Sequence, residues 1–271
     1  MRYHTVFDTS FWVGLLEVTT DLPQSLLPQG RNATLEAIGR ALTKDSRKGI
    51  EGRLSEVDLR SDELLSTEEQ GVEGIYFPLS CLLCRLVSLP EGPTVKVSLV
   101  GTEGMAGLSA LVETSLSTFR TVVQLPGRAL FLPTTEARRF LDLSRLGEVL
   151  FGYVHLLLRE TSLTAACNRV HSARQRLARW LLLIRDRAGR DEFPLTHESL
   201  SAMLGIRRES VTLSANELRS AGAIDYRRAT VAIRSPAKLR RESCSCYVAV
   251  TEGYARYLQA VLENHSRRRL L

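Results

Sequence analysis

The stretch that most constrains the fold is residues 195–233, LTHESLSAMLGIRRESVTLSANELRSAGAIDYRRATVAI. It predicts a helix, a tight turn, a second helix and a two-stranded hairpin. Thr196 is a good N-cap, and Gly205 can end the first helix in a left-handed conformation without steric cost. Apolar residues recur at helical spacing on both helices, so the two can share one small core. This is the spacing of a helix-turn-helix. The apolar set is Leu200, Met203, Leu204, Ile206, Val211, Ala215 and Leu218.

The second helix begins with a basic end that could enter a DNA major groove. Arg208 could bind guanine O6 and N7, and Glu209 could accept a hydrogen bond from cytosine N4. Arg207, Ser210 and Thr212 flank these two positions and could bind phosphates or base edges. An ordinary helical hairpin with solvated arginines would show the same helix-glycine-helix pattern.

The hairpin that follows resembles a phosphate-gripping wing. Residues 223–226 and 230–233 are predicted strands, with Arg227 and Arg228 near the tip. Together with Thr196, these arginines are expected to hold phosphates. A basic helix end next to a basic hairpin favours DNA binding over the ordinary hairpin.

The charge distribution supports a polyanion-binding C-terminal half. Residues 160–271 contain 20 Lys and Arg against 11 Asp and Glu, a net charge of +9, whereas residues 1–159 contain 16 against 19. Positive charge clustered with a candidate recognition motif is typical of nucleic-acid binding.

Several segments also resemble Crp/Fnr-type bacterial transcription regulators. The resemblance covers roughly residues 50–255 and is specific because the segments occur together. They are residues 75–78, 100–108, 166–168, 176–181, 195–198, 203–208, 210–212, 221–228 and 244–247.

The resemblance implies an α+β protein that binds double-stranded DNA in the cytoplasm as a homodimer on a two-fold-symmetric operator, with RNA polymerase as a further partner. The expected order is a jelly-roll β domain of the cyclic-nucleotide-binding type, a long dimerisation helix with a hinge, and a winged helix-turn-helix. The domain bounds are 46–135, 136–171 and 172–255, after an extension of unknown role at 1–45 and before a basic tail at 256–271.

The β domain is also expected from the residues themselves. Short segments rich in branched residues alternate with turn signals, which predicts a closed or double-sheet β domain. The expected strands are residues 53–59, 64–67, 74–77, 82–89, 94–100, 119–125 and 129–132. Residues 1–45 match nothing in the family; 33–42 could form a short helix, in a loose arm or packed on the β domain.

Residues 136–164 form one long helical pattern. Leu146, Leu150, Tyr153 and Leu157 follow at steps of four, three and four, which suits either a core face or a coiled-coil seam. Its position between two domains favours the seam. We expect a hinge at 165–171 and then a helix at 172–188, with Arg174, Arg176 and Arg179 available to solvent or phosphate, and one or two further helices within 236–257.

A cyclic-nucleotide pocket is only half matched. The resembled family uses a Gly-Glu pair for the ribose and an Arg-Ser/Thr pair for the cyclic phosphate. Here Arg120 and Thr121 resemble the second pair, but the first aligns with Ala106, Gly107 and Leu108, without a carboxylate. The candidate pocket is therefore Gly104, Gly107, Arg120 and Thr121, with another ligand or none favoured over a cyclic nucleotide, and no cofactor required.

The cysteine and histidine patterns argue against a metal centre and an enzyme. Cys81 and Cys84 lie in a predicted strand whose alternation sends them to opposite faces. Cys244-x-Cys246 is closer to a ligand pair, yet structural thiols are the favoured interpretation. No cysteine precedes position 81, which disfavours the N-terminal iron–sulfur sensor of some relatives. No histidine falls inside the β domain, and no nucleophile–base pair or glycine-rich phosphate loop occurs.

The sequence departs from the resembled family at Leu213, where some relatives place a base-reading arginine, and at Ala229, where the wing tip usually has glycine. The alternative function is a ligand- or redox-sensing β-domain protein that acts through a protein partner, with a degenerate helix-turn-helix. The N-terminus is expected to be non-secretory, and no run of 18 apolar residues predicts a membrane span.

Overall fold

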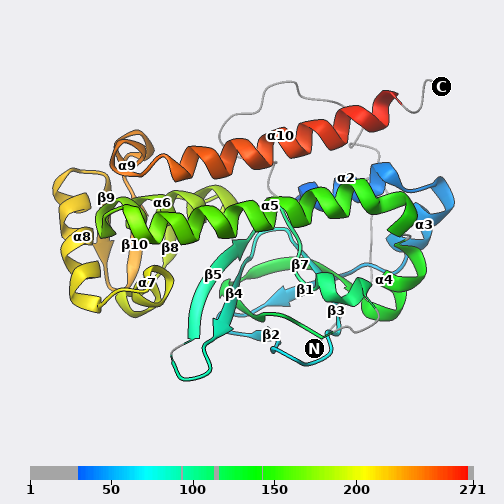
Figure 1. The fold of residues 1–271 in the computed structure, drawn as a ribbon, viewed down its shortest axis with the longest axis horizontal. Coiled ribbons are helices and arrows are strands. Elements are labelled where there is room, and N and C mark those ends of the chain that lie inside the picture. Colours follow the sequence, from blue (N-terminus) through cyan, green and yellow to red (C-terminus); the bar gives the residue numbers. More distant parts are fainter. Residues whose placement is uncertain (1–29, 93, 113–115, 142, 268–271) are drawn as a thin grey trace.

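The computed structural model describes residues 30–267 except 93, 113–115 and 142. The expectation for the first 29 residues therefore lies outside the described residues. In Figure 1 a β domain lies beneath two long helices, and a small helical domain with its own short sheet lies at one end. None of the helices in the described part of the chain combines the length and the apolar character of a membrane-spanning segment.

The β domain consists of two antiparallel sheets. The strand order is β1-β7-β3 in one sheet and β2-β6-β4-β5 in the other. Inward-facing residues of both sheets, such as Tyr76, Leu83 and Phe131, share one core. All seven expected strands form, with ends shifted by at most two residues. Their bounds are β1 Ser55–Leu59, β2 Leu64–Ser66, β3 Gly74–Pro78, β4 Leu82–Ser88, β5 Thr94–Val100, β6 Arg120–Leu125 and β7 Gly127–Pro133.

Strand β4 is buried on both faces. Leu83 points into the core between the sheets, whereas Leu82 and Cys84 point into the core of the helical domain. Side chains alternate along a strand, so a continuous apolar run can serve two cores at once. The expected separation of Cys81 and Cys84 is confirmed, because they lie in different cores.

Helices cover the three-stranded sheet β1-β7-β3. Helices α2 (Ala33–Ala41), α4 (Thr134–Phe140), α5 (Leu143–Val170) and α10 (Cys246–Arg267) share a core with β3 and β7. Helix α10 runs back along α5 in the opposite direction (Figure 1). The segment expected to be a basic tail is therefore helical as far as Arg267.

The described part of the N-terminal extension packs onto the body of the protein. Asn32 is buried; its side chain caps α2 and donates to the carbonyls of Pro78 and Gly104, at 3.1 and 2.8 Å. Helix α3 (Lys44–Glu51) follows. From residue 30 onward, the loose-arm alternative is thus excluded.

The long helical pattern divides differently from the prediction. Leu141 leaves the helical conformation and is buried in the core, so α4 and α5 are separate helices. Helix α5 then continues through the expected hinge to Val170. The chain turns at His171, and Ser172 and Gln175 form the capping box that starts α6 (Ala173–Ala188).

The C-terminal domain contains the expected winged helix-turn-helix. Its elements are β8 (Glu192–Pro194), α7 (His197–Leu204), α8 (Arg208–Ser220), β9 (Ile224–Arg227), β10 (Thr230–Ile233) and α9 (Pro236–Glu242). Strand β8, which the sequence did not predict, pairs with β10 and makes the wing a three-stranded sheet.

Candidate nucleic-acid interface

The turn between α7 and α8 forms as the sequence predicts. Thr196 Oγ1 accepts the Ser199 amide at 3.0 Å and caps α7. Gly205 has φ 61° and ends the helix in the left-handed region. Ser201 Oγ donates to the carbonyl of Ile206 across the turn. The geometry of the helix-turn-helix is therefore fixed by short-range hydrogen bonds as well as by its core.

The N-terminal end of α8 carries the candidate base-reading residues. Arg207, Arg208, Glu209 and Ser210 are all exposed. Neither arginine forms an ion pair with another described residue. Two unpaired guanidinium groups beside the positive end of a helix form a local field that favours a polyanion.

Thr212 has a more structural position than expected. It is half-buried, and its Oγ1 lies 3.0 Å from His197 Nδ1 and donates to the Arg208 carbonyl at 3.1 Å. The His197 ring stacks on Tyr226 of the wing, with centroids 4.4 Å apart. Partial burial, and then the charge of Arg208, lower the pKa of His197. Thr212 and His197 therefore join both helices to the wing.

The wing tip is a tight turn with two left-handed residues. Arg228 has φ 47° and Ala229 has φ 61°, and Arg227 pairs with Thr230 across the hairpin. Two consecutive positive φ values are typical of a type I′ turn, which favours glycine at such positions. Arg227 is exposed and lies 3.2 Å from Asp225. Arg228, also exposed, forms no ion pair among the described residues.

The prediction that the arginines of α6 are available to solvent or phosphate is wrong for two of them. Arg176 and Arg179 are only 8% and 1% exposed, so they are not available to DNA. Arg176 donates to the Leu204 carbonyl at the end of α7, and Arg179 donates to Thr164 Oγ1 at 2.8 Å. Arg174 lies 2.5 Å from Glu242. Much of the positive charge of this helix is therefore used in contacts within the protein.

Helix α7 is fixed to the β domain. Lys96 Nζ on β5 donates to Ser199 Oγ at 2.6 Å and to Gln124 Oε1 at 2.5 Å. Leu82, Leu99 and other sheet residues extend into the core of the helical domain. The helix-turn-helix is thus held against the β domain by both polar and apolar contacts.

The candidate effector residues differ in their surroundings. A Cβ at Gly104 would lie 2.4 Å from the Tyr153 hydroxyl, and one at Gly107 would lie 2.2 Å from the Gly74 carbonyl. Thr121 is buried, whereas Arg120 is exposed. Both glycines therefore serve close packing. A groove of about 870 Å³ lies elsewhere, between α6, α9 and α10.

The expected dimer seam on α5 is also corrected. Leu146, Leu150 and Tyr153 are at most 5% exposed and belong to the core of their own chain; Leu157 is half-buried against it. These four residues form a core face, the alternative that their spacing had left open. A different face of α5 is apolar and exposed: Phe151 at 77%, Val154 at 46% and Leu158 at 64%.

A buried ion cluster links four elements and was not predicted. Arg187 at the end of α6 lies 3.2 Å from Glu103 and 2.8 Å from Glu160 of α5. It also donates to the Leu99 carbonyl at 2.7 Å, while Tyr254 of α10 donates to Glu160 at 3.0 Å. Burial raises the pKa of Glu103; at Glu160 burial opposes but Arg187 prevails, and the pKa is lowered. Nothing local in the sequence pairs these charges.

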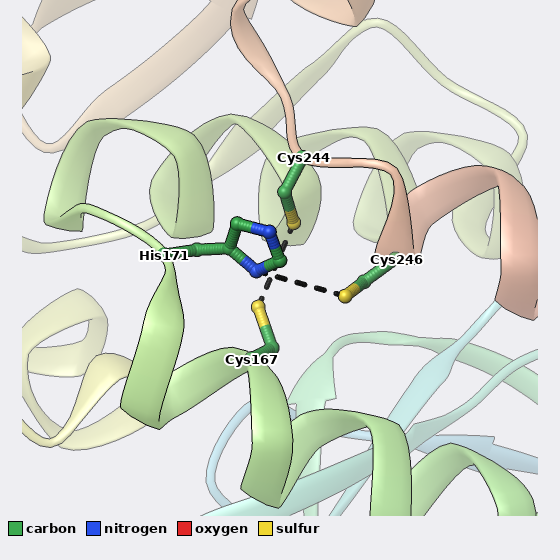
Figure 2. Close-up of side chains that lie close together, drawn as sticks. All are labelled: Cys167, His171, Cys244 and Cys246. Carbon is green, nitrogen blue, oxygen red and sulfur yellow. Dashed lines mark hydrogen bonds between the residues drawn. The ribbon is translucent and has the colours of Figure 1, made fainter.

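Three cysteines and a histidine form a second unpredicted cluster. Figure 2 shows Cys167 and His171 from the end of α5 pointing toward Cys244 and Cys246 beside the start of α10. Their ligand atoms lie within 4.8 Å of one another, so the set could hold a metal ion. The Cys167 hydrogen bond lowers the pKa of Cys244 to about 5. The one-turn spacing of Cys167 and His171 was a signal that could have been combined with Cys244-x-Cys246.

Comparison with known proteins agrees with this architecture. Residues 175–242 match the family described as the Crp-like helix-turn-helix domain. No curated protein matches the sequence.

Solved structures of bacterial regulators share the fold. FixK2 from Bradyrhizobium japonicum is 16% identical with a TM-score of 0.58, over 70% of this chain and 98% of its own. A CRP-family transcriptional regulator from Thermus thermophilus is 21% identical with a TM-score of 0.57, over 69% and 96%. The c-di-GMP-responsive regulator CLP of Xanthomonas campestris is 10% identical with a TM-score of 0.56, over 71% and 100%. This chain therefore carries a Crp-like helix-turn-helix domain and shares its fold with solved regulators of the CRP and Crp/Fnr families.

Proposed function

We propose that this protein binds a two-fold-symmetric DNA operator as a homodimer and regulates transcription through contact with RNA polymerase. The observation that carries the proposal is the exposed basic end of α8, whose arginines form no ion pair with a described residue, beside a basic wing. In this arrangement Arg208 and Glu209 read base edges, and Arg207 and Ser210 flank them. A well-formed bidentate contact contributes about 1–3 kcal/mol of discrimination at one base pair.

In this proposal, contacts to the phosphate backbone of the DNA come from both sides of the recognition helix. Thr196 lies at the N-terminus of α7, where free amides and the helix dipole favour a phosphate. Arg228 at the wing tip is free to bind a second phosphate, whereas Arg227 would have to loosen its pair with Asp225. Thr212 supports the interface through His197.

The dimer is proposed to form through the exposed face of α5. Phe151, Val154 and Leu158 follow at steps of three and four, and exposed Thr161 and Ala165 continue the same spacing toward the end of the helix. This is the heptad spacing of a two-helix seam, and pairing would remove the three large side chains from water. A two-fold axis along this face would present two recognition helices, as half-sites about 34–36 Å apart require.

The test is selection of bound sequences from random duplex DNA with the purified full chain. The expected result is an enriched two-fold-symmetric motif. Arg208→Ala should relax preference at one base pair of each half-site, because it removes a base contact. Arg228→Ala should weaken binding to all sequences and reduce the salt dependence, because it removes a phosphate contact.

Arg60→Ala is the matched control, since Arg60 is an exposed arginine of the β domain far from α8 in sequence. It should leave both preference and salt dependence unchanged. An unchanged motif with Arg208→Ala would refute the recognition assignment. No enriched motif, with only weak salt-sensitive binding, would favour the alternative of a protein that acts through a protein partner.

A further inference from the structure

The Cys167–His171–Cys244–Cys246 cluster has the donor set of a metal centre. Three thiols and one imidazole are brought together from segments more than 70 residues apart, and the three cysteines are buried. Cys167 and His171 are one helical turn apart at the end of α5, while Cys244 and Cys246 flank a single exposed serine. Both halves therefore come from backbone that is already fixed by a helix end.

Two separations between ligand atoms match the lengths of opposite edges of a tetrahedral metal site. Cys167 Sγ lies 3.6 Å from Cys244 Sγ, and Cys246 Sγ lies 3.7 Å from His171 Nδ1. Usual Zn–S and Zn–N bond lengths give tetrahedral edges of about 3.8 Å between two sulfurs and about 3.6 Å between sulfur and nitrogen. All remaining ligand-atom separations are within 4.8 Å, so shifts of about an ångström complete the tetrahedron.

A buried arginine next to the cluster supplies the charge that such a centre needs. Zn²⁺ with three thiolates and a neutral imidazole carries a net charge of −1. Arg179 is 1% exposed, and its positive charge acts on Cys167 and Cys246. Its Nε and Nη1 have no hydrogen-bond partner within the described part of the chain. Buried N–H groups are nearly always bonded, so these two lack a partner that an anionic centre beside Arg179 could supply.

Cys81 and Cys84 differ from this cluster in the residues that surround them. Cys81 and Cys84 are equally buried but lie in separate cores, and burial raises the pKa of each to about 12. Neither belongs to a group of three or more candidate metal ligands among the described residues. The four-residue cluster instead combines several donors, an adjacent positive charge and a half-exposed histidine through which an ion could enter.

We propose that Cys167, His171, Cys244 and Cys246 bind one structural Zn²⁺ that ties the end of α5 to the start of α10. Four protein ligands close the coordination sphere, which is the pattern of structural rather than catalytic zinc. The ion sits where α5 turns into α6, so it fixes the angle between the long helix and the helix-turn-helix domain. This inference is independent of DNA binding, and so is its test.

The experiment measures zinc in the full chain, purified under reducing conditions without a metal-chelating tag. About one Zn²⁺ per chain is expected, with a fall in the urea midpoint after removal of the ion and recovery when Zn²⁺ alone is restored. Replacement by Co²⁺ should give the intense visible absorption of tetrahedral cobalt, with a sulfur-to-metal charge-transfer band. Cys244→Ser should lose the bound ion, whereas Cys84→Ala, the matched control, should keep it.

A further variant keeps the test decisive if Cys244→Ser does not fold. His171→Cys should retain the ion and strengthen the charge-transfer band, because a fourth thiolate replaces the imidazole. Folded wild-type protein with no zinc and no cobalt–thiolate band would overturn the proposal. So would a Cys167–Cys244 disulfide in place of the ion, or a bound ion that survives the double change of Cys244 and Cys246 to serine.

Discussion

Replacing Arg187 with methionine removes the only cation shown within ion-pair distance of two buried carboxylates in the described structure. Arg187, Glu103 and Glu160 are each at most 4% exposed. The change removes two ion pairs and the 2.7 Å hydrogen bond to the Leu99 carbonyl. Glu160 keeps the Tyr254 hydroxyl and the more distant charge of Arg179, and Glu103 keeps the Gly101 amide, but neither keeps a described cation within ion-pair distance.

The expected loss in free energy of unfolding is about 3–5 kcal/mol, the usual result of leaving a buried charge without its partner. Here two buried carboxylates lose their cation, so the loss in free energy of unfolding should lie toward the upper end of this range. Methionine has similar length and no charge, so cavity formation adds little. A domain stability of about 5–15 kcal/mol makes this loss readily visible by urea unfolding.

The pH dependence has a definite sign. Without Arg187, both buried carboxyls have pKa values above those of the unfolded chain, so the folded variant binds protons that the unfolded chain does not. Its stability therefore rises as the pH falls from 7 toward about 4.5, and the deficit relative to wild type shrinks. In the wild type the pKa of Glu160 is lowered, so that contribution is present above its unfolded pKa and is lost on acidification.

Two comparisons separate this reasoning from simple damage to a core. Arg256→Met removes an exposed pair 3.9 Å from Glu252 and should change stability little. Changing Glu103 and Glu160 to glutamine together with Arg187→Met should recover part of the loss. A cost below about 1 kcal/mol, or a deficit that does not depend on pH, would refute the assignment of a coupled ion cluster.

Two further predictions follow from the wing and the long helix. Ala229→Gly should raise the free energy of unfolding by about 1 kcal/mol, because glycine adopts φ 61° without strain. The control Ala260→Gly, at an exposed helical position, should lower the free energy of unfolding by a similar amount. A lower free energy of unfolding with Ala229→Gly would contradict the I′ turn. Leu158→Glu should shift the protein from dimer to monomer in sedimentation, whereas Leu89→Glu on the exposed β4–β5 turn should not; an unchanged dimer would mean that another face pairs.

Local sequence rules predicted the helix-turn-helix well. Thr196 caps α7 and Gly205 ends it because these depend on interactions within a few residues. The seven strands of the β domain also formed, since branched residues between turn signals determine short strands locally. Strand β8 was missed because Phe193 and its neighbours are a strand only when β10 lies beside them.

Orientation of helical faces was predicted less well. Helix α5 has two apolar faces, and its sequence does not say which one the β domain covers; the structure buries Leu146 and Tyr153 and leaves Phe151 exposed. Arg176 and Arg179 were expected at the surface because arginine is usually exposed, but α6 is surrounded on several sides.

The sequence by itself determined the helix-turn-helix, its capping and the basic N-terminal end of its second helix, because those depend on residue types at short spacing. Only the tertiary structure decided the clusters built from distant segments. Arg187 forms an ion pair with Glu103, which lies 84 residues earlier in the chain, and Cys167 contacts Cys244, which lies 77 residues later. Both contacts form because α6 and α10 pack back onto earlier elements. Such pairings depend on the path of the whole chain, which no local pattern of charge or spacing contains.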